Sequence, residues 1–118
     1  MKDDVLKELH DILEAASNIR RFLTGKKYED YAEDDLLRSA VERKFEIIGE
    51  ALNRIGKADP SVLSEIREHR SIISFRNILI HGYNSIDNRI VWGIVEEDLD
   101  NLIQDVTRLL KEAGGTAE

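Results

Sequence analysis

The sequence predicts an all-α protein, most simply an antiparallel four-helix bundle. Apolar residues recur at alternating spacings of three and four along most of the 118 residues, which is the helical period. No segment shows the alternation of a strand. Short loops separate the helical segments, and short loops place consecutive helices side by side and antiparallel. The length suits one core, so we expect a single domain over residues 1–118.

The first two helices carry long apolar stripes. Gly25 ends the first helix, and residues 26–31 form a loop. Tyr28 and Tyr31 in this loop lie beside two lysines and could stack RNA bases, but packing on the end of the bundle is the simpler interpretation. The second helix runs from Asp34 or Asp35 to Ile55, with Gly56 as its C-terminal cap. The stripe of the first helix is Val5, Leu9, Ile12, Ala16, Ile19 and Leu23.

The third helical segment is predicted to be broken. Asp59-Pro60 is a typical helix start, since aspartate accepts free N–H groups and proline tolerates the first position. The segment breaks near residues 69–71 and resumes to His81. A fourth helix starts at Asp87 or Asn88 and reaches about residue 111, before a frayed tail. Gly49 and Gly93, inside helices, predict close approach of neighbouring helices, because glycine is otherwise unfavourable there.

Composition restricts the function. A net charge of −7 argues against a protein that coats nucleic acid with its whole surface, so any RNA contact is local. The middle of the chain is relatively basic and the last helix is acidic. The absence of cysteine excludes disulfides and thiolate chemistry and fits a reducing compartment. The chain shows neither a signal peptide nor an apolar run of membrane length. We therefore expect a cytoplasmic protein that does not enter a membrane.

Three glutamates on the second helix raise the question of a metal site. Glu42, Glu46 and Glu50 recur every four residues, as carboxylates do in di-iron bundles. Such sites also require Glu-x-x-His motifs, and none of the three histidines follows a glutamate at that spacing. Zinc is equally poorly supported without cysteine or paired histidines. We predict no metal and no cofactor, and a solvated glutamate face with local partners such as Arg54 for Glu50.

The segment Arg76-Asn77-Ile78-Leu79-Ile80-His81-Gly82-Tyr83 places polar groups inside an apolar helix. With Arg76 at 0° on a helical wheel, Ile80, Ile73, Asn77 and His81 fall at roughly 40°, 60°, 100° and 140°. The opposite side carries Ile72, Phe75, Ile78 and Leu79, which we expect in the core. The first face then presents an apolar ridge between charged groups. We predict that Ile73 and Ile80 form a dimer interface.

These side chains suit chemistry on a phosphodiester. A guanidinium offers paired donors to phosphate, and imidazoles exchange protons near neutral pH. Asn77, one turn before His81, could orient the imidazole. In a two-fold dimer, two copies of Arg76 and His81 would meet in one cleft, and one histidine can act as base while the other acts as acid. The alternative is that both residues only cap the helix end and complement its dipole.

At these residues the chain resembles the HepT-type toxins, a branch of the HEPN superfamily. The match consists of the Arg-x4-His-x-Tyr motif, the second-helix segment at residues 42–51, and the stretch from Ile86-Asp87 through Val91-Trp92. It extends over essentially the whole chain. One difference is His69-Arg70, where relatives often carry a proline-tryptophan pair.

The resemblance implies a HEPN-like bundle and a homodimeric, metal-independent ribonuclease toxin that cleaves RNA with Arg76 and His81, supported by Asn77. It also implies a cognate minimal nucleotidyltransferase, MntA-like, as antitoxin, which would neutralise the toxin by AMPylation of Tyr83. An alternative within the superfamily is a non-catalytic binding or scaffold subunit of a nucleotidyltransferase complex. The sequence leaves open which RNA would be cut.

Overall fold

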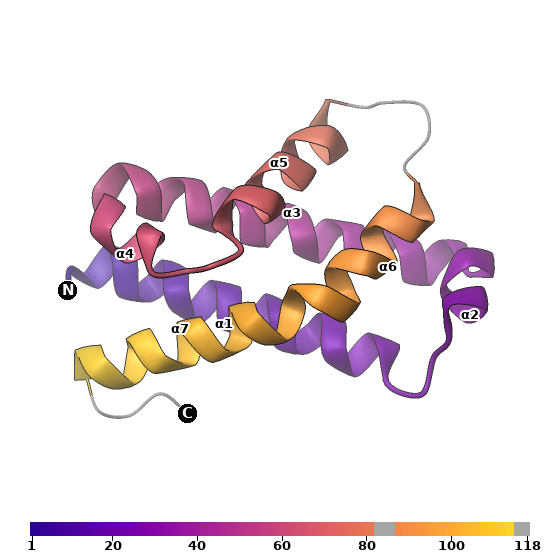
Figure 1. Cartoon of the computed structure of the whole chain (residues 1–118), viewed down its shortest axis with the longest axis horizontal. Coiled ribbons are helices and arrows are strands. Elements are labelled where there is room, and N and C mark those ends of the chain that lie inside the picture. The colour runs from indigo at the N-terminus through magenta and orange to yellow at the C-terminus, as the bar shows by residue number, and fades with distance from the viewer. Residues whose placement is uncertain (82–86, 115–118) are drawn as a thin grey trace.

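The computed structural model describes residues 1–81 and 87–114 of the chain. All regular structure within these ranges is helical, which confirms the predicted all-α class. Figure 1 shows the order of the helices. The helices are α1 (Asp3–Leu23), α2 (Tyr28–Glu33), α3 (Asp35–Ala58), α4 (Pro60–Ser64), α5 (His69–Ile80), α6 (Asn88–Glu97) and α7 (Leu99–Gly114).

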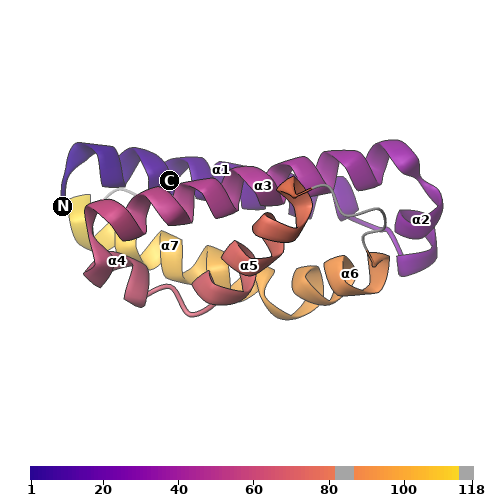
Figure 2. The same ribbon diagram turned by 90° about the horizontal axis from the view of Figure 1, so that it is seen from above.

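Four antiparallel helical segments make the bundle, as predicted. They are α1, α3, the pair α4 and α5, and the pair α6 and α7. Helix α1 contacts both α3 and α7, and α5 packs on α3, so α1 and α3 form the centre to which the other segments attach (Figures 1 and 2). The predicted stripe of α1 is buried throughout. The largest fully buried side chains are Leu9, Ile12, Ile19, Tyr31, Phe45, Ile48, Leu52, Ile55, Ile66, Ile72, Leu102 and Leu109.

Gly25 ends α1 with a φ of 75°, a left-handed conformation that glycine adopts without strain. The loop predicted for residues 26–31 is wrong in part, because α2 begins at Tyr28. The backbone N–H of Lys27 donates to the Asp30 carboxylate over 2.8 Å and caps this short helix. Tyr31 is completely buried. The expected packing of this segment on the bundle end is therefore confirmed.

An aromatic cluster joins α2 to α6 at this end. The ring centroids of Tyr31 and Trp92 lie 5.6 Å apart, and those of Tyr28 and Trp92 lie 6.0 Å apart in an edge-to-face arrangement. The guanidinium of Arg89 lies 3.9 Å from the Tyr28 ring centroid, within cation–π distance. These contacts occupy both tyrosines within the protein and leave Tyr31 no surface for a nucleobase.

The prediction that Gly56 caps α3 is wrong, because the helix continues to Ala58. A Cβ atom at position 56 would lie 2.9 Å from Cδ2 of Leu63. Glycine at this position therefore makes room for α4. The predicted start of α4 is confirmed, since the Asp59 side chain accepts from the backbone N–H of Val62 and Pro60 occupies the first turn.

The break in the third segment falls at residues 65–68, slightly before the predicted position. Contacts with α7 hold it there. The carboxylate of Asp105 accepts hydrogen bonds from the backbone N–H of Arg67 at 3.0 Å and from its Nε at 3.1 Å. The amide of Asn101 donates to the carboxylate of Glu68 at 2.8 Å. The Asp105 carboxylate thus satisfies a backbone N–H at the break, which a continuous helix would pair with a carbonyl.

The fourth segment also breaks, which the sequence analysis missed. Asp98 separates α6 from α7, and its carboxylate accepts a hydrogen bond from the Ser71 hydroxyl at 2.7 Å. The predicted close approach at Gly93 is wrong, since a Cβ there would meet no described atom within 4 Å. Helix α7 runs to Gly114, beyond the predicted end near residue 111. None of the described helices combines the length and apolar character that a membrane span requires.

Candidate functional site

Helix α5 carries the predicted site and is anchored to α3 by one face. Ile72, Phe75 and Leu79 are buried, and the rings of Phe75 and Phe45 meet edge to face at 5.5 Å. The prediction that Ile78 also enters the core is wrong, because this side chain is 40% exposed. Figure 1 shows that the C-terminal end of α5 rises away from the bundle, while Leu79 in the same turn stays buried.

Arg76 lies against α3 and is not on the open face that the helical wheel suggested. Its side chain is only 20% exposed. A Cβ atom at Gly49 would lie 2.3 Å from Cβ and 2.6 Å from Cγ of Arg76, distances that real atoms do not reach. The close helix approach predicted for Gly49 is therefore confirmed. The partner is the aliphatic stem of Arg76, which fits there because Gly49 has no side chain.

The Arg76 guanidinium has a different environment at each nitrogen. Its Nη1 donates to the side-chain oxygen of Asn77 at 3.1 Å, and its Nη2 lies 3.9 Å from Oε2 of Glu50. The third nitrogen, Nε, is buried and has no hydrogen-bond partner among the described residues. The head group is thus held between an amide on its own helix and a carboxylate on α3.

The expected pairing of Glu50 with Arg54 is wrong. Nε of Arg54 donates to Glu8 on α1 at 3.0 Å, and Glu50 pairs with Arg76. Glu46, one turn earlier on α3, pairs with Arg43 at 3.1 Å. The glutamate face is therefore only partly the solvated surface that the sequence suggested, since Glu50 turns toward α5.

His81 lies at the end of α5, where its imidazole is exposed to solvent. Its backbone N–H donates to the carbonyl of Asn77 at 3.2 Å, which fixes the residue as the C-cap. The Asn77 side chain, which the sequence analysis expected to orient the imidazole, contacts Arg76 in this structure. Its oxygen accepts from Arg76, and no hydrogen bond joins it to His81 in the described part of the chain. The helix thus presents a constrained guanidinium and, five residues later, an accessible imidazole.

The remaining predictions concern the dimer interface, the modification site and metal binding. Ile80 is 43% exposed, whereas Ile73 is half-buried and packs against the core, so the apolar ridge is uneven. Tyr83, the predicted modification site, lies outside the described residues. Across the described ranges, no three His, Asp or Glu side chains gather closely enough to hold a metal ion. The site also includes Glu50, which the sequence analysis expected to pair with Arg54 and which pairs with Arg76.

Comparisons with known proteins identify the family to which this bundle and its Arg-x4-His helix belong. The family model described as "Ribonuclease HepT-like" matches residues 12–109, a range that includes α5 and the whole of α3. The chain is a member of the HepT-like family, within the HEPN superfamily.

The chain is 35% identical over 105 residues to a protein of Methanocaldococcus jannaschii named "Putative RNase", with 89% of this chain and 95% of the relative covered. It is 36% identical over 103 residues to the "Probable ribonuclease HepT" of Thermococcus cleftensis, with 87% and 93% covered. A "Putative RNase" of Caldanaerobacter subterraneus is 29% identical over 104 residues, with 88% and 92% covered. No solved structure matches the chain with statistical significance.

Proposed function

We propose that this protein is a metal-independent endoribonuclease whose reacting groups are Arg76 and His81. The observation that carries the proposal is the pair itself: a guanidinium held against α3 and an exposed imidazole five residues later, in a chain of the HepT-like family. Guanidinium groups bind phosphate with paired donors, and imidazole is the side chain best suited to move protons near neutral pH.

The proposed reaction is an internal transfer at one phosphodiester of RNA. A ribose 2′-hydroxyl attacks the adjacent phosphorus while a His81 imidazole removes its proton. Arg76 stabilises the negative charge that develops on the phosphoryl oxygens. The bond to the 5′-oxygen breaks, and a second imidazole gives that oxygen a proton. The products are a 2′,3′-cyclic phosphate and a 5′-hydroxyl. DNA lacks the nucleophile and would not react.

A two-fold dimer would supply the second imidazole. One chain offers one His81, whereas an isologous interface places the same residue of both chains around a single axis. The exposed Ile80 and the half-buried Ile73 beside it are the apolar residues that we expect at this interface. Covering this apolar surface in a dimer would remove it from water, which favours association.

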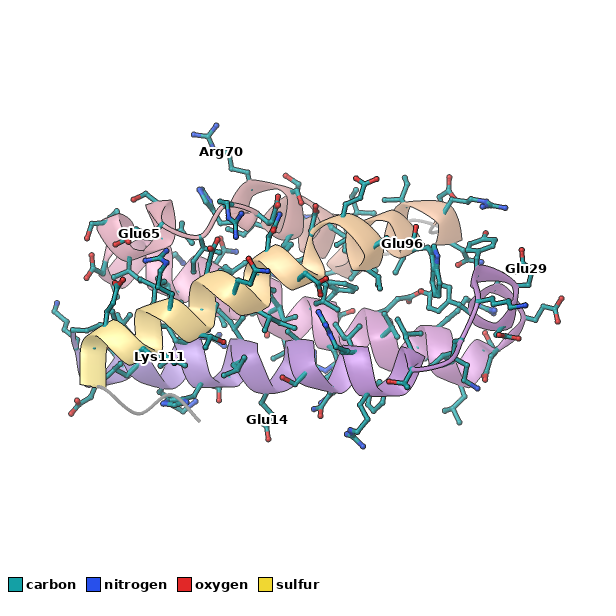
Figure 3. All side chains as sticks on the ribbon, turned by 60° about the horizontal axis from the view of Figure 1, so that its bottom comes forward. Glu14, Glu29, Glu65, Arg70, Glu96 and Lys111 are labelled. Carbon is teal, nitrogen blue, oxygen red and sulfur yellow. The ribbon has the colours of Figure 1, made fainter. Side chains whose placement is uncertain are left out.

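Cleavage of RNA in EDTA tests this mechanism. Purified, unmodified protein is incubated with total tRNA and mRNA, beside the variants His81→Ala and Arg76→Ala. Loss of acid–base help at His81 should slow cleavage about 10²-fold to 10⁴-fold. Arg70→Ala is the control, since Arg70 is an exposed arginine of the same helix that points into solvent (Figure 3). His81→Ala that cuts as fast as the parent, or activity that needs a divalent ion, would contradict the mechanism.

We further propose that the protein is the toxin of a toxin–antitoxin pair in the cytoplasm. Its antitoxin would be a minimal nucleotidyltransferase that transfers AMP from ATP to the hydroxyl of Tyr83 and releases pyrophosphate. Tyr83 follows His81 by two residues, so the added phosphate would bring a negative charge close to the imidazole and repel RNA. This proposal is supported by the Arg-x4-His-x-Tyr motif and by the family.

A second candidate function is a binding or scaffold subunit of a nucleotidyltransferase complex without nuclease activity. The net charge of −7 favours it, because an acidic surface attracts RNA poorly. The incubation in EDTA separates the two functions. A scaffold would bind the nucleotidyltransferase and leave every RNA intact, in the parent as in His81→Ala.

A further inference from the structure

The side chain of Glu50 reaches the site from a different helix than Arg76, and it does so in a partly buried place. Glu50 is 30% exposed and Arg76 is 20% exposed. By contrast, the Arg43 of the neighbouring pair with Glu46 is 61% exposed. Exposed ion pairs contribute little because water and salt screen them. Because both partners are shielded, water and salt screen the Glu50–Arg76 attraction less than that of the Glu46–Arg43 pair.

The contacts with Gly49 and Asn77 do not fix the orientation of the Arg76 guanidinium. Gly49 fixes the path of the stem, because Cβ and Cγ of Arg76 occupy the space of a side chain at that position. The guanidinium can still turn about the terminal bonds of the side chain. Asn77 holds Nη1, but a single contact from an exposed neighbour on the same helix does not define the plane of the head group.

Glu50 supplies the second point of attachment. At 3.9 Å, its carboxylate attracts Nη2 electrostatically but is too far to accept a direct hydrogen bond. The hydrogens of Nη2 are therefore available to another acceptor. Nε, on the same side of the fork, also has no partner among the described residues. Nε is buried, however, so the phosphate would be received at the terminal nitrogens, where Nη2 has hydrogens to donate.

We propose that Glu50 is a positioning residue, whose carboxylate holds the guanidinium of Arg76 in the orientation that receives an RNA phosphate. This inference rests on the proposed function of Arg76. Glu50 does not touch the substrate in this arrangement, and its charge lies near the phosphate that Arg76 binds. Its removal therefore has two opposite effects. The guanidinium loses its orientation, which lowers kcat, and a repelling charge disappears, which lowers KM or leaves it unchanged.

The variant Glu50→Gln tests the proposal, with Glu46→Gln as matched control. Both glutamates lie on α3, one turn apart, with similar exposure, and each pairs with one arginine. For Glu50→Gln we expect kcat to fall about tenfold to a hundredfold without a rise in KM, and for Glu46→Gln no change in either. If Glu50→Gln keeps the kcat of the parent, or if kcat falls equally in both variants, the positioning role is overturned.

A second measurement does not depend on nuclease activity. The Nε–H of Arg76 gives an NMR resonance that is assigned by its loss in Arg76→Lys. Because Nε is buried, this proton should exchange slowly with water in the parent and in Glu46→Gln, and faster in Glu50→Gln. Equal exchange in all three would overturn the inference. If the parent cuts no RNA while the exchange rates differ as expected, the proposed function fails and the positioning of Arg76 by Glu50 stands.

A double-variant comparison separates positioning from a general loss of structure. In an Arg76→Lys background, Glu50→Gln has no guanidinium left to orient, so its further effect on kcat should vanish. Thermal unfolding of each variant shows that the fold persists. Full additivity of the two substitutions in kcat would mean that Glu50 acts elsewhere and would overturn the proposal.

Discussion

Replacement of Gly49 by alanine tests whether the contact between α3 and α5 sets the position of Arg76. The new Cβ would lie 2.3 Å from Cβ of Arg76, against an ordinary contact of at least 3.4 Å. Both atoms are attached directly to a helix backbone, so no rotation of a side chain can relieve the clash. The backbone of α5 must move away by about 1 Å, and a displacement of this size can cost about 10²-fold in rate.

The effect on stability can be isolated with Gly93→Ala as the control. Alanine gains about 1 kcal/mol over glycine in a helix interior, and this gain is common to both variants. At position 93 the new methyl group meets no described atom within 4 Å, so the variant should be more stable than the parent. At position 49 overpacking should cost about 1 to 3 kcal/mol. The two variants should therefore differ by that cost alone.

Urea denaturation followed by circular dichroism measures both unfolding free energies, and RNA cleavage in EDTA measures the activity. We expect Gly49→Ala to be the less stable variant and the less active one, with Gly93→Ala retaining the parent rate. Equal stability of the two alanine variants would refute the close contact. A destabilised Gly49→Ala that cleaves RNA at the parent rate would refute the link between helix spacing and the position of Arg76.

Three further predictions concern assembly, modification and pH. Sedimentation at micromolar concentration should show a dimer that Ile80→Asp dissociates; a monomeric parent would remove the composite site. Intact-mass spectra after incubation with the active nucleotidyltransferase, ATP and Mg²⁺ should show AMP adducts that Tyr83→Phe lacks, while Tyr83→Phe keeps its nuclease activity; an adduct on Tyr28 would contradict the assignment. Asp105→Asn should cost about 1 to 3 kcal/mol of unfolding free energy at neutral pH, because it weakens the polar contacts that hold Arg67.

The pH dependence of that last difference has a defined sign. Burial alone would raise the pKa of Asp105, but hydrogen bonds from Arg67 outweigh it and hold the pKa below its ordinary value of 3.8. The folded state therefore binds the proton less readily than the unfolded chain. The stability advantage of the parent over Asp105→Asn should be complete above about pH 5 and shrink as pH falls through 3.8 toward the folded value. An advantage that grows in acid would contradict this assignment.

The fold was predictable where local signals decide it. The stripe of α1, the Asp59-Pro60 start and the four segments all follow from periodicity and capping. The break at Asp98 was not predictable, because no glycine or proline marks it and its carboxylate is bonded to Ser71 on another helix. Gly56 was misread for the same reason: its role depends on Leu63, which meets it only in the folded chain.

The candidate site shows the same division. The spacing of Arg76 and His81 places both near the end of one helix, and the sequence identifies this directly. A helical wheel gives the direction of a side chain but not which neighbouring helix covers it. The placement of Arg76 against Gly49, its pairing with Glu50 and the turn of Asn77 toward it are tertiary contacts. Gly49 predicted a close approach of helices, but the sequence did not indicate that Arg76 would be the residue in contact.

The last turn of α5 has consequences for how such an enzyme would respond to its own abundance. Ile78 and Ile80 are 40% and 43% exposed on opposite sides of this turn, and the turn leads to His81. In the dimer that we propose, a second copy covers this turn and binds by mass action, so the covered fraction falls on dilution. Activity per molecule should then rise with protein concentration. A cell with few copies would tolerate the protein, and a cell that overproduces it would cross a threshold.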